Sequence, residues 1–144
     1  MISSRTPIRV RYADTDQMKM VYYGKFFEYF EQGRSDLLRD LGMPYPEIER
    51  IGYFLPVIEA HARYLHSARY DDLLTVTTIL RERPQVRVRI EYQVHNERKE
   101  LLAEGHTIHG FVRAETGKPA RAPQEFLELV GKKFGAIPSP HSSQ

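Results

Sequence analysis

Residues 26–42 read FFEYFEQGRSDLLRDLG and carry the clearest structural signal in the chain. The residues that repeat at intervals of three or four are Phe26, Phe30, Gly33, Leu37 and Leu41. This interval places them on one face of a helix. Gly42 suits the position just past a helix end, and Pro44 cannot continue the helix. The sequence therefore predicts a long helix whose apolar face packs against a broad surface.

Strand patterns fill most of the remaining chain. Residues 8–12 alternate and are β-branched, and further strand-like segments lie at residues 54–67, 73–81, 85–96 and 101–113. Residues 123–134 look like a terminal helix. This order predicts an α+β fold with one long central helix, an antiparallel sheet of about five strands and a short C-terminal helix. Gly33 is unfavourable inside a helix by about 1 kcal/mol relative to Ala, so we expect the sheet to approach closely there.

The length of 144 residues fits one domain that buries its own core. We expect a single domain over residues 1–144, with its core at about 8–134 and a flexible tail from Ile137 to Gln144. A long edge strand invites pairing with a second copy of the chain, so we also expect a dimer or a tetramer.

The composition excludes several classes of function. The chain has no cysteine, which excludes a disulfide scaffold, a cysteine-ligated metal site and a catalytic thiol. The formal net charge is only +2, which argues against a nucleic-acid partner. No apolar run reaches the roughly 18 residues of a membrane span, and the N-terminus does not read as a signal peptide. We therefore expect a cytoplasmic protein.

Two acids in one loop draw attention as chemical groups. Asp14 and Asp16 lie between the first strand and the long helix, whose start contains Tyr22, Tyr23 and Gly24. A helix start presents unpaired N–H groups that can stabilise a developing oxyanion, and a facing carboxylate can act as nucleophile or general base. The residues alone are more typical of a turn or a helix cap than of a catalytic site, and both interpretations stand at this point.

The chain resembles the 4-hydroxybenzoyl-CoA thioesterase family of hotdog-fold proteins, which includes the YbgC-like acyl-CoA thioesterases. The matching segments are Arg9-Val10, Thr15-Asp16, Val21-Tyr22-Tyr23-Gly24, Tyr29-Phe30-Glu31, Arg69-Tyr70-Asp71-Asp72, Leu101-Leu102-Ala103-Glu104-Gly105 and Thr116-Gly117-Lys118-Pro119. The resemblance covers roughly residues 8–130. It implies a hotdog fold, in which the sheet wraps the central helix.

The resemblance also implies roles for individual residues. The second acid of the Asp-x-Asp pair is catalytic in the family, which points to Asp16. The backbone N–H that polarises the thioester carbonyl falls on Tyr23, with Gly24 beside it and Tyr22 at the border of the site. The family needs neither a metal nor a cofactor, coenzyme A being part of the substrate, and its dimers often pair into tetramers.

Two positions differ from the usual family pattern. Lys19 stands where the family usually has a glycine, which suits a turn with positive φ. Tyr23 stands where many members have a histidine. Both differences bear on rate and substrate more than on the fold.

Other charged residues are weaker candidates. Arg87 and Arg89 share one strand face, and we interpret them either as an exposed basic face or as contacts to the phosphates of coenzyme A. His106 and His109 lie three apart on a strand and so point to opposite faces, which argues against a metal pair.

The resulting prediction is an acyl-CoA thioesterase that hydrolyses a thioester to a free acid and coenzyme A. Asp16 attacks the thioester carbon or activates water, and the N–H of Tyr23 stabilises the oxyanion. The alternative is a non-hydrolytic module that binds acyl-CoA or an acyl-carrier protein. A hotdog dehydratase is a further alternative, but its His and acid pair has no matching segment.

Overall fold

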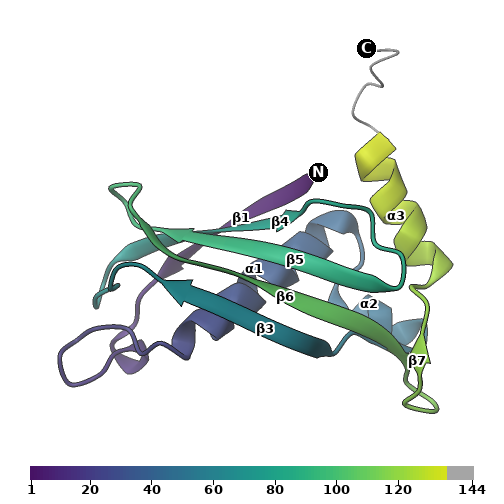
Figure 1. Cartoon of the computed structure of the whole chain (residues 1–144), viewed down its shortest axis with the longest axis horizontal. Helices are drawn as coiled ribbons and strands as arrows, with labels where there is room; N and C mark the ends of the chain where they lie inside the picture. Colours follow the sequence, from purple (N-terminus) through teal and green to yellow (C-terminus); the bar gives the residue numbers. More distant parts are fainter. Residues whose placement is uncertain (136–144) are drawn as a thin grey trace.

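The computed structural model describes residues 1–135, so the predicted tail from Ile137 to Gln144 lies outside it. One antiparallel sheet lies across the long helix α1 (Lys25–Leu41), as Figure 1 shows. Its long strands run in the order β1-β4-β5-β6-β3. Their bounds are β1 (Ile2–Arg9), β3 (Val57–Tyr64), β4 (Leu73–Leu80), β5 (Arg87–His95) and β6 (Leu101–Arg113).

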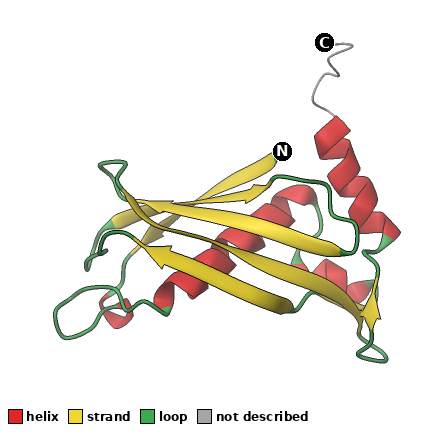
Figure 2. Cartoon of the chain, in the orientation of Figure 1, coloured by secondary structure: helices red, strands yellow, loops and turns green. Residues whose placement is uncertain are grey.

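Short elements complete the fold. The short strands β2 (Tyr53–Phe54) and β7 (Pro119–Ala120) pair with the C-terminal end of β6. The helix α2 (Tyr45–Arg50) follows α1, and α3 (Gln124–Gly135) lies at one end of the sheet (Figure 2). This arrangement confirms the predicted α+β class and the hotdog fold. Within the described residues, no helix has both the length and the apolar character needed to cross a membrane.

The first strand begins earlier than predicted. The sequence indicated a strand at residues 8–12, whereas β1 spans Ile2–Arg9 and a 3-10 turn, η1 (Tyr12–Asp14), follows it. The inward positions of β1 include Ser4 and Thr6, which are buried although they are polar. These two residues conceal the alternation in the sequence. The core therefore starts at Ile2 rather than near residue 8.

The strand predicted at residues 54–67 is also interrupted and shorter in the structure. Residues 54–67 divide into β2 and β3, with Pro56 between them. Proline has no backbone N–H to donate to a neighbouring strand, so it interrupts the ladder. The segments at 73–81, 85–96 and 101–113 are confirmed with small changes at their ends.

The helix packs as its apolar face predicts. Phe30 stacks on Tyr92 of β5, with ring centroids 4.4 Å apart and ring planes within 5°. Gly33 lies directly over β4, where an added Cβ would clash with the hydroxyl of Thr78 and lie 2.9 Å from a methyl group of Val76. The close approach predicted at Gly33 is confirmed. Gly42 ends the helix with a φ of 91°, as its position in the sequence predicts.

A polar network runs through the layer between the helix and the sheet. Arg34 of α1 donates to the hydroxyls of Tyr45 (2.6 Å) and Tyr92 (3.1 Å). The hydroxyl of Tyr92 meets that of Thr107 at 2.6 Å, and Thr107 meets a ring nitrogen of His109 at 2.8 Å. Since Arg34, Tyr92, Thr107 and His109 are buried, this part of the network is shielded from water. It ties α1 to β5 and β6 through polar contacts rather than apolar packing alone.

Candidate active site

The site occupies the loop between β1 and α1, the dark blue loop at the lower left of Figure 1. The loop folds back on itself because Thr15 and Val21 form an isolated bridge. The N–H of Asp16 donates to the carbonyl of Met20 at 2.9 Å, and the N–H of Lys19 donates to the carbonyl of Asp16 at 2.9 Å. This tight turn fixes the backbone that carries Asp16.

The carboxylate of Asp16 is exposed and held by the backbone. Its Oδ1 accepts hydrogen bonds from the N–H groups of Met18 (2.8 Å) and Met20 (3.2 Å). Within the described residues, Oδ2 has no such partner. The side chain is therefore oriented through one oxygen while the other stays available.

Lys19 completes the turn with a φ of 63°. This is the left-handed region that favours glycine. The family pattern usually has a glycine at this position, and so predicts a turn with positive φ here. The turn thus forms with a lysine in a conformation that is unfavourable for it.

Asp14 plays a different part from Asp16. It is buried, and it accepts hydrogen bonds from the N–H of Arg11 (3.1 Å), the guanidinium of Arg11 (3.1 Å) and the hydroxyl of Tyr29 (3.0 Å). The ammonium of Lys25 lies 3.8 Å away. Burial raises the pKa of Asp14, but the hydrogen bonds from Arg11 and Tyr29 outweigh it and hold the pKa below the usual 3.8.

The backbone of Asp14 also reaches the start of the helix. Its carbonyl accepts the N–H of Tyr22 at 3.2 Å. Asp14 therefore joins the end of η1 to the segment that leads into α1. These contacts agree with the interpretation of Asp14 as a residue that holds the turn.

The start of α1 leaves two backbone donors without a partner. The carbonyls of Tyr22, Tyr23 and Gly24 accept the N–H groups of Lys25, Phe26 and Phe27. Among residues 1–135, no acceptor meets the N–H of Tyr23 or Gly24, and no side chain caps the helix. These donors lie at the positive end of the helix dipole. The expected oxyanion donor at Tyr23 is thus free, and Gly24 offers a second one.

Aromatic rings line this end of the molecule. Tyr22 and Tyr23 are exposed, and the ring of Tyr23 lies 4.7 Å from that of Tyr64 at the end of β3. The hydroxyl of Tyr64 donates to the carbonyl of Tyr23 at 3.2 Å. Tyr64 also packs against Phe26 at 5.5 Å. Sequence reasoning missed Tyr64; the signal available was an aromatic residue at the end of a strand that leads back to the loop.

The two predicted phosphate contacts lie elsewhere. Arg87 and Arg89 are on β5, and their neighbours Val88 and Ile90 point into the core against α1. The arginines consequently project from the opposite face of the sheet. Asp16, Tyr22, Tyr23 and Gly24 thus lie in one segment between β1 and α1, whereas Arg87 and Arg89 lie on β5. A role of these arginines in phosphate binding stays a prediction.

The described residues contain no group of three or more His, Asp or Glu side chains placed to hold a metal ion. The chemistry that this segment offers is a held carboxylate and free backbone N–H groups in the same loop. Such a pair can act on a carbonyl carbon and stabilise the charge on its oxygen.

Comparison with known proteins shows what the whole chain is similar to. A putative acyl-CoA thioesterase, YneP of Bacillus subtilis, is 31% identical over 123 residues, covering 85% of this chain and 89% of that protein. The acyl-CoA thioester hydrolase YbgC of Escherichia coli O157:H7 is 26% identical over 125 residues, covering 85% and 92%. A DHNA-CoA thioesterase from Staphylococcus aureus aligns with a TM-score of 0.86 at 31% identity, covering 93% of this chain and 92% of that one.

The match to a family is equally broad. The model of the Thioesterase-like superfamily matches residues 10–130, a range that includes the Asp16 loop, α1 and all strands after it. Because this range is most of the chain and contains the whole candidate site, the protein belongs to the Thioesterase-like superfamily.

Proposed function

We propose that this protein is an acyl-CoA thioesterase, which hydrolyses a thioester to a free acid and coenzyme A. The observation that carries the proposal is the carboxylate of Asp16, held through Oδ1 in the same loop that ends in the free N–H groups of Tyr23 and Gly24. The names of the relatives favour a coenzyme A thioester over other carbonyl substrates.

The reaction uses these groups in two parts. The thioester carbonyl oxygen accepts hydrogen bonds from the N–H groups at the helix start, which stabilise the negative charge of the tetrahedral intermediate. Asp16 either attacks the carbonyl carbon or takes a proton from an attacking water. Collapse of the intermediate breaks the C–S bond and releases coenzyme A. In the nucleophilic route, water then hydrolyses the resulting anhydride.

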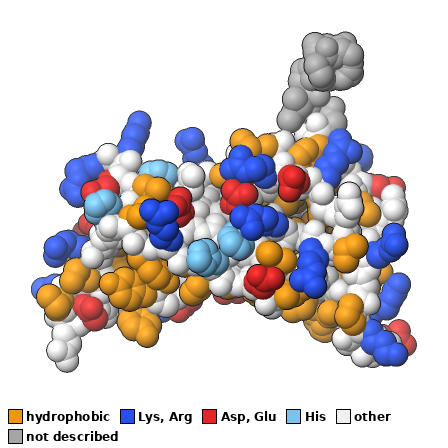
Figure 3. Space-filling model, viewed as in Figure 1, with side chains coloured by type: hydrophobic (Ala, Val, Ile, Leu, Met, Phe, Trp, Pro, Cys, Tyr) orange, Lys and Arg blue, Asp and Glu red, His pale blue; other side chains and the backbone are white. Residues whose placement is uncertain are grey.

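A second copy of the chain completes the proposal. Within residues 1–135, β3 pairs with β6 along one edge and with no strand along the other, and Val57 and Ile58 near its start are exposed. Hydrophobic side chains gather at the lower left of Figure 3, where the end of β3 meets the loop before α1. Pairing of two β3 edges would cover this surface and place part of each acyl pocket on the partner subunit.

The test is thiol release from acyl-CoA substrates by the wild type and by Asp16→Asn. The panel spans acetyl, hexanoyl, palmitoyl, benzoyl and 4-hydroxybenzoyl thioesters. We expect Asp16→Asn to lower kcat at least about 100-fold, because a neutral amide is neither a base nor a nucleophile here. The matched control is Asp40→Asn, an exposed acid near the far end of α1, with unchanged activity.

The outcomes separate the two function classes. Equal melting temperatures for both variants show that a loss of rate comes from chemistry rather than unfolding. A folded Asp16→Asn variant with wild-type turnover would overturn the assignment of Asp16. No turnover of any thioester by the wild type, with retained coenzyme A binding, would favour the non-hydrolytic binding module instead.

A further inference from the structure

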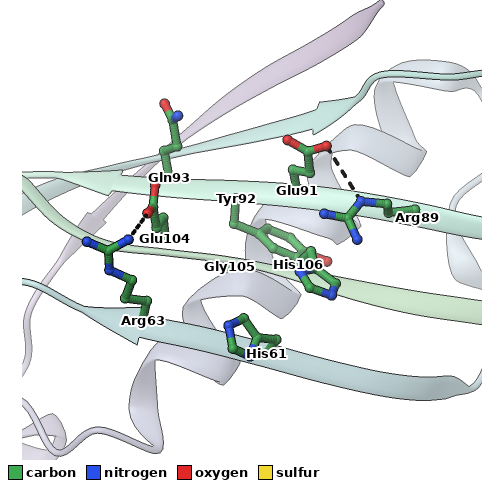
Figure 4. A pocket seen from close by; sticks show the side chains of 9 residues that line it. All are labelled: His61, Arg63, Arg89, Glu91, Tyr92, Gln93, Glu104, Gly105 and His106. Atoms are coloured by element: carbon green, nitrogen blue, oxygen red, sulfur yellow. Dashed lines mark ion pairs between the residues drawn. The ribbon is translucent and has the colours of Figure 1, made fainter.

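The end of β3 brings one side chain, that of Tyr64, to the start of α1. Successive residues of a strand point to opposite faces of the sheet. The guanidinium of Arg63 projects from the face that points away from α1, where it lies 3.6 Å from the carboxylate of Glu104 on β6 (Figure 4). Tyr64 therefore projects from the face that carries α1, and its ring packs against that of Phe26 at 5.5 Å.

The backbone on both sides of Tyr64 is held by β6. Tyr64 is the register partner of Ala103. Just beyond it, the N–H groups of Leu65 (2.8 Å) and His66 (3.1 Å) both donate to the carbonyl of Leu102. The position of the Tyr64 side chain is thus set by the sheet and not by the loop that carries Asp16.

The hydroxyl of Tyr64 contacts one peptide group of the helix start. It donates to the carbonyl of Tyr23 at 3.2 Å, and the same carbonyl accepts the N–H of Phe26 at 3.1 Å. The carbonyl of Tyr23 and the N–H of Gly24 belong to one planar peptide unit, and in a trans peptide they point in opposite directions. Two donors on this carbonyl therefore fix the direction of the Gly24 N–H, which meets no acceptor among residues 1–135.

The same contact affects the strength of the donor. Hydrogen bonds in a chain polarise one another, so a donor on the carbonyl of Tyr23 strengthens the N–H of Gly24. Burial, followed by the nearby Tyr23, raises the pKa of Tyr64, so its hydroxyl keeps the proton that it donates. The N–H of Tyr23 belongs to the preceding peptide, whose carbonyl accepts the N–H of Lys25 instead.

The space beside Gly24 suits the approach of a ligand atom. Gly24 has a φ of −62° and a ψ of −22°, a conformation that any residue adopts, so the backbone does not require glycine here. An added Cβ would lie 3.0 Å from the ring of Tyr22. The missing side chain leaves room for close approach to the backbone between this ring and the N–H of Gly24.

We infer that Tyr64 is a positioning residue of the proposed active site, which aims the N–H of Gly24 at the carbonyl oxygen of the thioester. The inference rests on the proposed function. Tyr64 acts through the Tyr23–Gly24 peptide rather than on the substrate itself. Because β3 is the strand proposed to pair with a second copy, Tyr64 also connects that edge of the sheet to the oxyanion donor.

The first test is the steady-state kinetics of Tyr64→Phe, which keeps the ring and removes the hydroxyl. We expect kcat to fall about 10-fold with KM unchanged, because the hydrogen bond supports a charge that develops only in the transition state. The loss is smaller than the roughly 100-fold loss on removing an oxyanion donor, since the N–H of Gly24 is still present. The shape of the pH profile of kcat should not change, because Asp16 is untouched.

The matched control is Tyr53→Phe. Tyr53 of β2 pairs with Arg113 at the C-terminal end of β6, whereas Tyr64 pairs near the opposite end of that strand. The hydroxyl of Tyr53 has no hydrogen-bond partner within the described residues. Both kcat and KM of this variant should equal those of the wild type.

The second test observes the peptide directly. Tyr23-Gly24 is the one Tyr-Gly pair in the sequence. A sample labelled with ¹³C at the carbonyl of tyrosine and with ¹⁵N in glycine therefore gives a single HNCO signal, which reports the carbonyl of Tyr23 and the N–H of Gly24 together. We expect this signal to move in Tyr64→Phe, which keeps the aromatic ring in place, and to stay where it is in Tyr53→Phe.

The outcomes separate this inference from the proposed function. A Tyr64→Phe variant with the kcat of an active wild type would overturn the inference and leave the proposed function standing. A lower kcat accompanied by a lower melting temperature and an unmoved HNCO signal would show a merely structural role, and would overturn it as well. No turnover of any thioester by the wild type would overturn the proposed function and the inference together.

Discussion

Asp14 and Asp16 lie two residues apart and have opposite environments. Asp14 is 3% exposed and accepts hydrogen bonds from Arg11, just before η1, and from Tyr29 of α1, whereas Asp16 is exposed and, among the described residues, held by its own loop. The local sequence does not distinguish them, because the burial of Asp14 comes from Tyr29, fifteen positions along the chain. Only the resemblance to a family directed the prediction to Asp16.

The role of Asp14 leads to a prediction about stability. Asp14→Asn removes the charge that Arg11 and the nearby Lys25 balance, so we expect a loss of about 1–3 kcal/mol in the free energy of unfolding. The lowered pKa means that the native carboxylate contributes stability above its unfolded pKa and loses it as the pH falls further. Urea unfolding at pH 7 and pH 3 measures both effects. An equal loss at both values would contradict the charge argument.

Apolar periodicity in the sequence predicts the bounds of some elements correctly and of others wrongly, and the contacts between elements explain the difference. The helix and the strand β6 follow apolar periodicities that the sequence displays, and their predicted ends agree with the structure within a residue or so. β1 was misjudged because Ser4 and Thr6 occupy core-facing positions. Propensity and periodicity describe one element, whereas the burial of a polar residue depends on the strand beside it.

Gly33 shows how one element constrains another. Alanine normally stabilises a helix interior by about 1 kcal/mol relative to glycine, but here Gly33→Ala should destabilise the protein by about 1–3 kcal/mol, since Thr78 and Val76 occupy the space. The control is Gly131→Ala in α3, where an added Cβ meets nothing within 4 Å and should raise stability. Thermal unfolding of both variants measures the contrast. A stabilised Gly33→Ala variant would show that the helix and β4 can separate freely.

The stability of the whole molecule should depend on pH through His109. Burial, followed by the nearby charge of Arg34, lowers the pKa of His109 to about 4. The unfolded chain therefore binds this proton more readily between about pH 6.5 and pH 4, so stability falls by up to about 3 kcal/mol over that window. The variant His109→Gln, which can still hydrogen-bond Thr107, should flatten this part of the curve. Urea unfolding at pH 7, 5.5 and 4.5 compares the two, and parallel curves would contradict the assignment.

Assembly is the other property of the whole molecule. Ile58→Glu places a charge at an exposed position of β3, the strand proposed to pair with a second copy, which should convert the proposed dimer to a monomer and lower thioesterase activity at least 10-fold. Val86→Glu, at an exposed position outside the strands, should change neither. Light scattering after size-exclusion chromatography gives the mass. A wild type that is monomeric and active would show that one chain suffices.

Sites assembled by the whole molecule are the least visible in the sequence. The loop and helix start of the candidate active site are contiguous, so a motif can reveal them. Arg5, Thr77 and Gln93, in contrast, become neighbours through the register of three strands, and no local pattern marks their proximity. Arg87 and Arg89 were predicted from a shared strand face, which is correct, but face alone does not say which end or side of the sheet a ligand approaches.

The pairing of β1 with β4 also has a consequence for the order of events during synthesis. Ile2 is the partner of Leu80, and Arg9 is the partner of Leu73, so the first strand emerges from the ribosome long before its neighbour exists. At roughly 5–20 residues per second, this delay lasts several seconds. Throughout it, the helix has no sheet to cover its apolar face, and the Asp16 loop lacks its contacts with residues 68–70. The Asp16 loop is consequently made before α1 but acquires its shape only once residues 68–70 have been made.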